Sequence, residues 1–345
     1  MRGHPAFAAT CKWQTGVSGT MAEKLLSELM DPAGDCPLEE WLDQLEDIAE
    51  DHGRFEPLGP DHSATFIDRS PSCLLVTFET VSTARARPDC DVPLGWELAA
   101  ERDWSQLCLL SHGETWFRHR AVYMYFDRLV DEGFFDGFDH VVFYGTDSAG
   151  YAAAAYSVVS PGATVIAISP QATLDPRVTE WDDRFQHMRR TSFTDRYGYA
   201  PDMLEAAWRA FILYDPEDDF DAAHAALFTR PNVEKIRCRH FDGQIETFLY
   251  EMDLLQPLID RAMDGTLTPA DFHRALRARR DYLPYLRRLL GALVEAERPY
   301  LTGLLCRNVL QHINAPRFRR QLRHAERALQ ARGRKLPPLR TLQEA

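Results

Sequence analysis

The stretch GTDSAG at positions 145–150 contains two side chains that could perform covalent chemistry, Asp147 and Ser148. An apolar run precedes it and an alanine-rich run follows at once, which is typical of a sharp turn from a strand into a helix. A carboxylate or hydroxyl held at such a turn could attack an ester-type carbon, with a nearby base to move the protons. The first question is which of the two residues lies at the apex.

Steric requirements distinguish the two possible registers of the turn, one with Asp147 and one with Ser148 at its apex. The apex residue of such a turn has a strained backbone, so the residues two before and two after it must be small. With Asp147 at the apex, these residues are Gly145 and Ala149. With Ser148 at the apex, the first of them is Thr146, whose β-branched side chain fits less well. The sequence therefore favours Asp147.

The elements that must hold this turn follow from the alternation of apolar runs with amphipathic stretches. Short apolar runs predict buried strands at residues 73–78, 106–110, 141–144, 164–169, 211–214 and 233–238. Amphipathic patterns predict helices from Pro37 to Gly53, over His119–Val130 and from Tyr151 onward. Continuous apolar strands separated by helices indicate a parallel sheet covered on both faces. We therefore expect an α/β fold with a doubly wound, mostly parallel sheet over residues 55–262.

The rest of the chain divides by composition. From Thr268 onward the pattern is helical only, and residues 271–345 carry 17 Lys and Arg against 6 Asp and Glu. We expect a disordered extension over 1–20, an N-terminal helical segment over 21–54, a C-terminal all-helical basic region over 265–330 and a flexible tail over 331–345. The basic helices either pack on the acidic body of the same chain or bind an anionic partner.

The composition also excludes several classes of protein. The seven cysteines show no CxxC pair and no metal-ligand spacing, so we expect reduced thiols, a cytoplasmic location and no bound metal or cofactor. No apolar run approaches the ~20 residues needed to cross a bilayer. The first 20 residues lack the apolar core of a signal peptide. The sequence leaves room for a small-molecule ligand and does not specify an oligomeric state.

The stretch AGYAAAAYSVVSPGATVIAISPQATLDP, which begins at Ala149, resembles the α/β-hydrolase superfamily. Within it, the chain is similar to a group of bacterial proteins whose elbow reads G-S-S-M-G-G-Y-A-A and whose later strand ends in SPQ. Residues 145–153 align with that elbow without gaps, and the segment Ser169-Pro170-Gln171 falls at the matching distance. The resemblance covers roughly residues 70–255. It implies an α/β-hydrolase-like fold with a nucleophile, an acid and a histidine.

Carried over to this chain, the resemblance implies a degenerate triad. The nucleophile position is occupied by Asp147, with Ser148 beside it. The acid follows the strand at 211–214, where Asp215 stands. The histidine position after the strand at 233–238 is occupied by Gln244. Glutamine cannot accept and return a proton near neutral pH, so the general base is missing.

Two histidines nearby are weaker candidates for the missing base. His240 is four residues before Gln244, but strand alternation places it on the face of Ile236 and Cys238, which favours a partly buried structural role. His224, on the helix after the acidic loop, is weaker still.

A loop after the second apolar run matches the place of the oxyanion hole in such folds. There, His112 and Gly113 are candidates, since Gly113 would let a backbone N–H face the site. The remaining binding candidates are the residues that open the elbow helix, Ala149, Gly150 and Tyr151.

Three functions remain open at this point. The sequence favours an α/β-hydrolase-like protein that is weakly active or inactive and acts by binding. The second is an active hydrolase or acyl-transfer enzyme using Asp147 or Ser148 with His240. The third is an adenylyl- or sulfonucleotide-binding protein of the phosphoadenosine phosphosulfate reductase type, in which the same turn would correspond to the S-G-G-x-D-S loop. Phe143 and Tyr144 are too bulky for that loop, and the Glu-Cys-Gly-x-His motif of the reductases is absent.

Overall fold

The computed structural model describes residues 37–86, 92–100 and 102–338. The sequence predictions for residues 1–20 and for the end of the tail, 339–345, therefore lie outside the described residues. The chain divides into two compact units. We call the first, Met1–Leu213 with Ala223–Lys235 and Ile259–Leu267, the sheet unit. The second, Tyr214–Ala222 with Ile236–Leu258 and Thr268–Ala345, is the helical unit.

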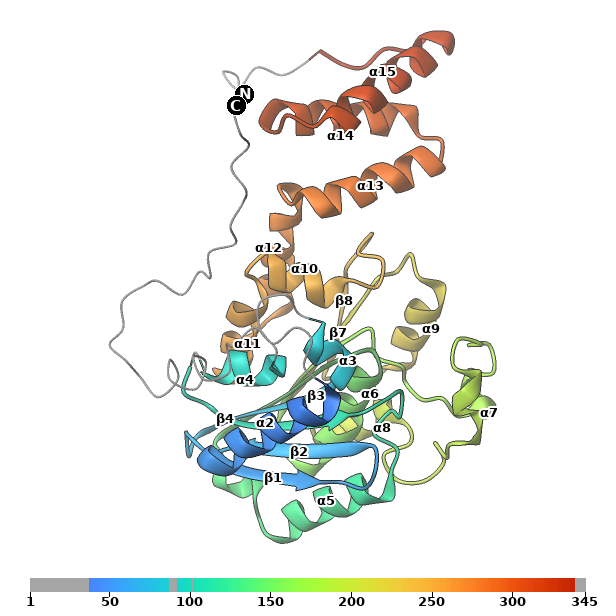
Figure 1. Ribbon diagram of the computed structural model, residues 1–345. Helices are drawn as coiled ribbons and strands as arrows, with labels where there is room; N and C mark the ends of the chain where they lie inside the picture. The colour runs from blue at the N-terminus through green and yellow to red at the C-terminus, as the bar shows by residue number, and fades with distance from the viewer. Residues whose placement is uncertain (1–36, 87–91, 101, 339–345) are drawn as a thin grey trace, which may run out of the picture. The chain divides into compact units, whose positions relative to one another are not determined.

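One sheet of eight strands organises the fold (Figure 1). The strands are β1 (Gly53–Pro57), β2 (His62–Ile67), β3 (Cys73–Thr80), β4 (Ser105–Ser111), β5 (His140–Thr146), β6 (Thr164–Ile168), β7 (Arg209–Tyr214) and β8 (Val233–Arg237). Their order is β1-β2-β4-β3-β5-β6-β7-β8. The pairs from β4 through β3, β5 and β6 to β7 are parallel, whereas β1, β2 and β4 pair antiparallel. The prediction of a doubly wound, mostly parallel α/β fold is confirmed.

The helices that precede the last strand are α2 (Leu38–His52), α3 (Val81–Arg85), α4 (Leu94–Ala100), α5 (Arg120–Asp131), α6 (Asp147–Tyr156), α7 (Pro176–Thr179), α8 (Ala200–Met203) and α9 (Asp219–Leu227). Among them, α2, α3, α4 and α6 pack against strands of the sheet. Helix α6 packs against β3, β5 and β6, and α2 against β1 and β2. The alanine face of α6 is fully buried, because small side chains let a helix approach a sheet closely.

The strands β1 and β2 are additions that the sequence did not predict. Their sequences, GRFEP and HSATFI, are short and partly polar, so they lack the apolar run that revealed the other strands. They pair at the edge of the sheet, where Arg54 lies opposite Phe66 and Glu56 opposite Ala64. Helix α2 covers them with Trp41 and Leu45, which belong to a buried cluster of this edge.

The rest of the chain is helical. These helices are α10 (Ile245–Glu251), α11 (Leu255–Met263), α12 (Pro269–Ala275), α13 (Leu283–Glu295), α14 (Pro299–His312) and α15 (Pro316–Ala331). Within the helical unit, α13 packs on α14 and α14 on α15. The all-helical C-terminal region expected from the sequence is confirmed. Among the described residues, none of the helices has the length and apolar character needed to cross a membrane.

Candidate functional site

The turn from β5 into α6 places Asp147 at its apex. Asp147 has a φ of 52°, in the left-handed region that non-glycine residues rarely adopt, and its side chain is exposed. A Cβ on Gly145 would lie 2.3 Å from the carbonyl oxygen of Ala149, so only glycine fits there. A Cβ on Gly150 would lie 2.9 Å from the carbonyl oxygen of Ile168. These contacts define a sharp strand-to-helix turn, the elbow, with Asp147 at its apex.

The residues that follow Asp147 turn toward the interior of the sheet unit. Ser148 is half-buried in the first turn of α6, and Ala149 is buried. Tyr151 is fully buried, and its hydroxyl donates to the carbonyl oxygen of Tyr197 at 2.5 Å. Tyr151 is therefore a core residue of the sheet unit, and it does not line an open site.

The loop after β4 is engaged in hydrogen bonds of its own. The Ser111 hydroxyl donates to the carbonyl oxygen of Gly113 at 2.5 Å, and the Gly113 N–H points at that same hydroxyl at 3.4 Å. The ring of His112 lies 3.5 Å from the hydroxyl of Ser63. Neighbouring His62 is buried, and this burial lowers its pKa to about 4. The Gly113 N–H is thus directed at a side chain of its own loop.

In the helical unit, Asp215 follows β7 and is buried. Its carboxylate accepts backbone N–H groups from Glu217 at 3.0 Å, Phe241 at 2.7 Å and Asp242 at 3.0 Å. Three backbone N–H groups thus converge on this one carboxylate, and such charge-assisted hydrogen bonds are stronger than those between neutral groups. Among the described residues, no histidine donates to Asp215. The acid position is thus satisfied by the backbone of the two turns that it joins.

Gln244 and His240 lie in the turn after β8, within the helical unit. Gln244 is exposed at the start of α10, and its Oε1 accepts from Arg288 at 2.7 Å. The alternation expected for His240 stops earlier, because β8 ends at Arg237. His240 is half-buried at a φ of 64°, beyond the strand. Its surroundings are therefore those of a tight turn.

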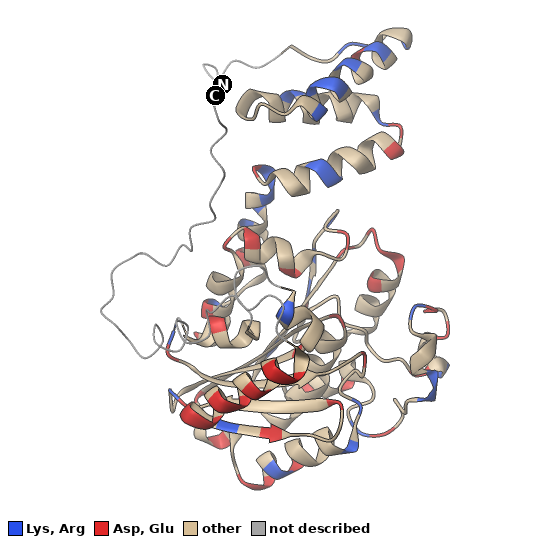
Figure 2. Ribbon diagram, viewed as in Figure 1, with Lys and Arg blue, Asp and Glu red and all other residues tan. Residues whose placement is uncertain are grey.

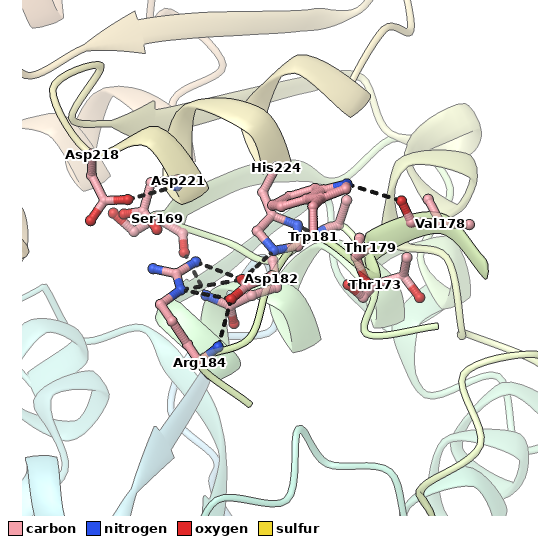
Figure 3. Close-up of polar contacts among 12 residues, drawn as sticks. Ser169, Thr173, Val178, Thr179, Trp181, Asp182, Arg184, Asp218, Asp221 and His224 are labelled. Carbon is pink, nitrogen blue, oxygen red and sulfur yellow. Dashed lines mark hydrogen bonds and ion pairs between the residues drawn. The ribbon is translucent and has the colours of Figure 1, made fainter. Parts of the chain in front are cut away.

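The structure reveals a buried pair in the sheet unit, formed by His224 and Asp182. His224 was the weakest of the candidate bases in the sequence. His224, on α9, is fully buried (Figure 3). Its Nδ1 accepts the backbone N–H of Ala172 at 3.1 Å, and its Nε2 lies 3.0 Å from Oδ2 of Asp182. Because Nδ1 is an acceptor, the ring proton is on Nε2, which donates to the carboxylate. Trp181 packs on the ring, with the ring centroids 4.8 Å apart.

Asp182 is the centre of this arrangement (Figure 3). Its side chain is fully buried and accepts from His224 on one side and from Arg184 on the other, the closest Arg184 contact being 2.9 Å. Burial alone would raise the pKa of the Asp182 carboxyl, but the hydrogen bonds from His224 and Arg184 outweigh it and hold the pKa well below its ordinary range.

This pair resembles a catalytic dyad but lacks a free ring nitrogen. Both nitrogens of His224 are engaged, one by a backbone N–H and one by a carboxylate. A general base needs a lone pair that can reach a substrate proton. The pair therefore ties the segment around residues 172–184 to α9. No local sequence pattern could have indicated it, because its members are 42 residues apart.

The described residues offer no group of three or more His, Cys, Asp or Glu side chains that could hold a metal ion. Of the described cysteines, Cys108, Cys238 and Cys306 are buried and Cys73 is half-buried. Burial raises the pKa of the Cys306 thiol to about 11, which keeps it protonated and weakly nucleophilic at neutral pH.

No protein-family model matches this chain, and no curated protein matches it in sequence. Solved structures that resemble it include an esterase from Pyrobaculum calidifontis, with 14% identity and a TM-score of 0.41 over 68% of this chain and 95% of the esterase. The capsule O-acetyltransferase of Neisseria meningitidis serogroup A has 12% identity and a TM-score of 0.36, over 57% of this chain and 92% of its own. Est1E from Butyrivibrio proteoclasticus has 10% identity and a TM-score of 0.38, over 60% of this chain and 97% of its own. Likenesses at this level do not say what the chain does.

Proposed function

We propose that this chain is an α/β-hydrolase-like protein with a degenerate triad, which acts by binding a ligand and has little or no hydrolase activity. The observation that carries the proposal is the engagement of Gln244. This residue occupies the position that the resemblance assigns to the histidine, and its Oε1 accepts from Arg288 at 2.7 Å. An amide cannot shuttle protons at neutral pH, and this one is already engaged within the helical unit.

Neither His224 nor His240 replaces this group. His224 has both ring nitrogens engaged within the core of the sheet unit. His240 lies in the turn that follows β8, and the neighbouring carboxylate of Asp215 accepts from the backbone of that turn instead. An acid that orients no histidine cannot support the proton transfers of a triad.

The elbow itself supports a binding role. An aspartate nucleophile would form an ester intermediate, and releasing it requires a water molecule activated by a base. Without that base the reaction stops after at most one turnover. The exposed carboxylate of Asp147 lies at the carboxyl end of β5, and ligands of open α/β sheets bind outside these strand ends. We infer that Asp147 faces a cationic or hydroxyl-bearing group of a small molecule.

The alternative readings gain less support. A sulfonucleotide reductase needs a reactive thiolate, whereas Cys306 is buried with a raised pKa. A phosphate-binding loop needs small residues before the turn, whereas the side chains of Phe143 and Tyr144 fill the core beside β5.

A panel of ester, thioester and epoxide substrates tests the proposal. We expect the wild-type chain to turn over none of them faster than Asp147→Ala or Ser148→Ala, with all three proteins at the rate of buffer. Steady turnover by the wild-type chain that Asp147→Ala or Ser148→Ala abolishes would contradict the proposal. Intact-mass measurement after epoxide treatment distinguishes a single adduct on Asp147 from true turnover.

A further inference from the structure

Helix α15 presents a strongly basic face. Its buried residues, Phe318, Ala325 and Leu329, lie on one side, and the helix packs on α14. The opposite side is exposed and carries the basic residues Arg317, Arg319, Arg320, Arg323, His324 and Arg327, with Glu326 as its one carboxylate. We call this side the basic face.

Among the described residues of its own unit, the basic face has no ionic partner. Arg319 donates to the side-chain oxygen of Asn314 at 2.9 Å. Among the described residues of the helical unit, no carboxylate pairs with Arg317, Arg320, Arg323 or Arg327; the ion pairs of this unit involve other arginines, such as Arg239 and Arg274. Five guanidinium groups on one helix repel each other, so an anionic partner would stabilise this face.

Helix α2 of the sheet unit shows the reverse pattern. Trp41, Leu45 and Ala49 are buried against the edge of the sheet. The other side carries seven carboxylates and neither lysine nor arginine: Glu39, Glu40, Asp43, Glu46, Asp47, Glu50 and Asp51. Among the described residues of the sheet unit, none of these carboxylates pairs with a cation. We call this side the acidic face; Figure 2 shows its red residues along α2 and the blue residues along α15.

The two faces match in length and spacing. Helix α2 has 15 residues and α15 has 16, which correspond to about 22 and 24 Å. Asp43, Asp47 and Glu50 follow one another at helical spacing on α2. On α15, Arg320, Arg323 and Arg327 do the same, so both rows have charges about 5–6 Å apart. We propose that two copies of this chain associate through the basic face of one copy and the acidic face of the other.

Other anionic partners fit these observations less well. A membrane-surface helix inserts an apolar face, but the apolar side of α15 is already buried in its own unit. A nucleic acid would bring a long polyanion toward a chain whose net charge is −13. A second copy instead brings a single acidic helix of matching length. The association does not depend on whether the elbow binds a ligand.

Sedimentation velocity of the full chain over a range of concentrations tests the proposal. We expect concentration-dependent association at about 0.1 M salt and its loss at about 1 M, because the Debye length shortens from about 10 Å to about 3 Å. Two triple variants reverse the charge of each face. One is Arg320→Glu with Arg323→Glu and Arg327→Glu, and the other is Asp43→Lys with Asp47→Lys and Glu50→Lys.

Each triple variant alone should dissociate at least about tenfold more readily than the wild-type chain, because like charges then face each other. An equimolar mixture of the two should associate again, since the reversed faces are complementary between different molecules. A matched control is Arg277→Glu with Arg280→Glu and Arg287→Glu, all exposed residues outside α15. It changes the net charge by the same amount as the triple variant of α15, and it should associate like the wild-type chain.

Three results would overturn the proposal. The first is a wild-type chain that stays monomeric at about 0.1 M salt. This result would contradict association between copies even if the basic and acidic faces of a single chain bound each other. The second is a mixture of the two reversed variants that does not associate although each keeps the wild-type circular dichroism spectrum. The third is tight binding of random-sequence duplex DNA by the wild-type chain without self-association, which would assign the basic face to nucleic acid.

Discussion

The imidazole of His224 is enclosed between the N–H of Ala172 and the carboxylate of Asp182, with no ring atom exposed to solvent. At the residue scale, this enclosure turns a group with catalytic potential into a structural one. Each ring nitrogen has a buried partner, so removing the ring leaves the N–H of Ala172 unsatisfied and takes one donor from the Asp182 carboxylate. The cost of unsatisfied buried groups exceeds the net gain from forming the bonds.

We expect His224→Ala to lower the free energy of unfolding by about 2–4 kcal/mol, through the lost partner of Asp182 and the cavity left behind. Urea unfolding followed by tryptophan fluorescence measures the change. His187→Ala is the matched control, because His187 pairs with Glu114 at 2.9 Å on the surface, half-exposed. This control should cost less than about 1 kcal/mol. Equal effects of the two variants would show that the buried pair has no special role.

A pH series separates the charge of Asp182 from the cavity. The folded pKa of Asp182 lies below its ordinary value of 3.8, so its ionised form stabilises the fold above that pH. This contribution disappears as the pH falls through the lower, folded pKa. In His224→Ala the folded pKa should rise toward the ordinary value, so the loss of stability on acidification should be smaller than in the wild-type chain.

At the scale of elements, two turns decide how the strand ends are arranged. The elbow after β5 needs the absence of a side chain at Gly145, whose Cβ would meet the backbone of α6. The turn after β8 is held by a side chain from the end of β7, since Asp215 accepts the N–H groups of Phe241 and Asp242. One carboxylate thus joins the ends of two strands within the helical unit.

Replacement of Asp215 by Asn tests this role. The amide group would present N–H donors to at least one of the backbone N–H groups that the carboxylate now accepts. We expect Asp215→Asn to lower the free energy of unfolding by about 1–3 kcal/mol. Urea unfolding followed by circular dichroism measures it. Asp242→Asn, which alters an exposed partner of Arg288, should change the value by less than about 1 kcal/mol. An unchanged free energy of unfolding in Asp215→Asn would show that the Asp215 carboxylate does not stabilise the turn after β8.

At the scale of the whole molecule, the two units contain different spectroscopic reporters. All seven tryptophans lie at or before Trp208 in the sequence. The six that belong to the described residues lie in the sheet unit, and the sequence of the helical unit has none. The helical unit holds α12 to α15, so it contributes strongly to the circular dichroism of the chain. Tryptophan fluorescence therefore follows the sheet unit alone, whereas circular dichroism follows the helices of both units.

We expect the two units to unfold at different urea concentrations, because each has its own core and a multidomain chain need not unfold in one step. The tryptophan transition should then differ in midpoint from the circular dichroism transition. A reporter variant, Leu301→Trp, places a tryptophan at an exposed position of the helical unit, and its added signal should report the unfolding of that unit. Coincident transitions from all three signals would mean that the units unfold as one.

The sequence by itself determined the features that depend on local patterns. The parallel strands appeared as continuous apolar runs because they are buried on both faces. The small residues around Asp147 indicated which register of the elbow is sterically feasible, and the φ of 52° falls on Asp147. The all-helical region and its basic charge could also be predicted, since both are properties of consecutive residues.

Only the tertiary structure decided which distant residues meet. Strands β1 and β2 have no apolar run, and their place at the edge follows from pairing with β4. The partners of His224, and those that tie Asp215 to the turn after β8, come from segments 26 to 52 residues away. Hydrophobic periodicity indicates which side of each segment is buried, but it does not indicate which distant segments pack against that side. The physical reason is that the role of a polar side chain depends on its hydrogen-bond partners. For His224 and Asp215, folding brings these partners from other elements of the chain.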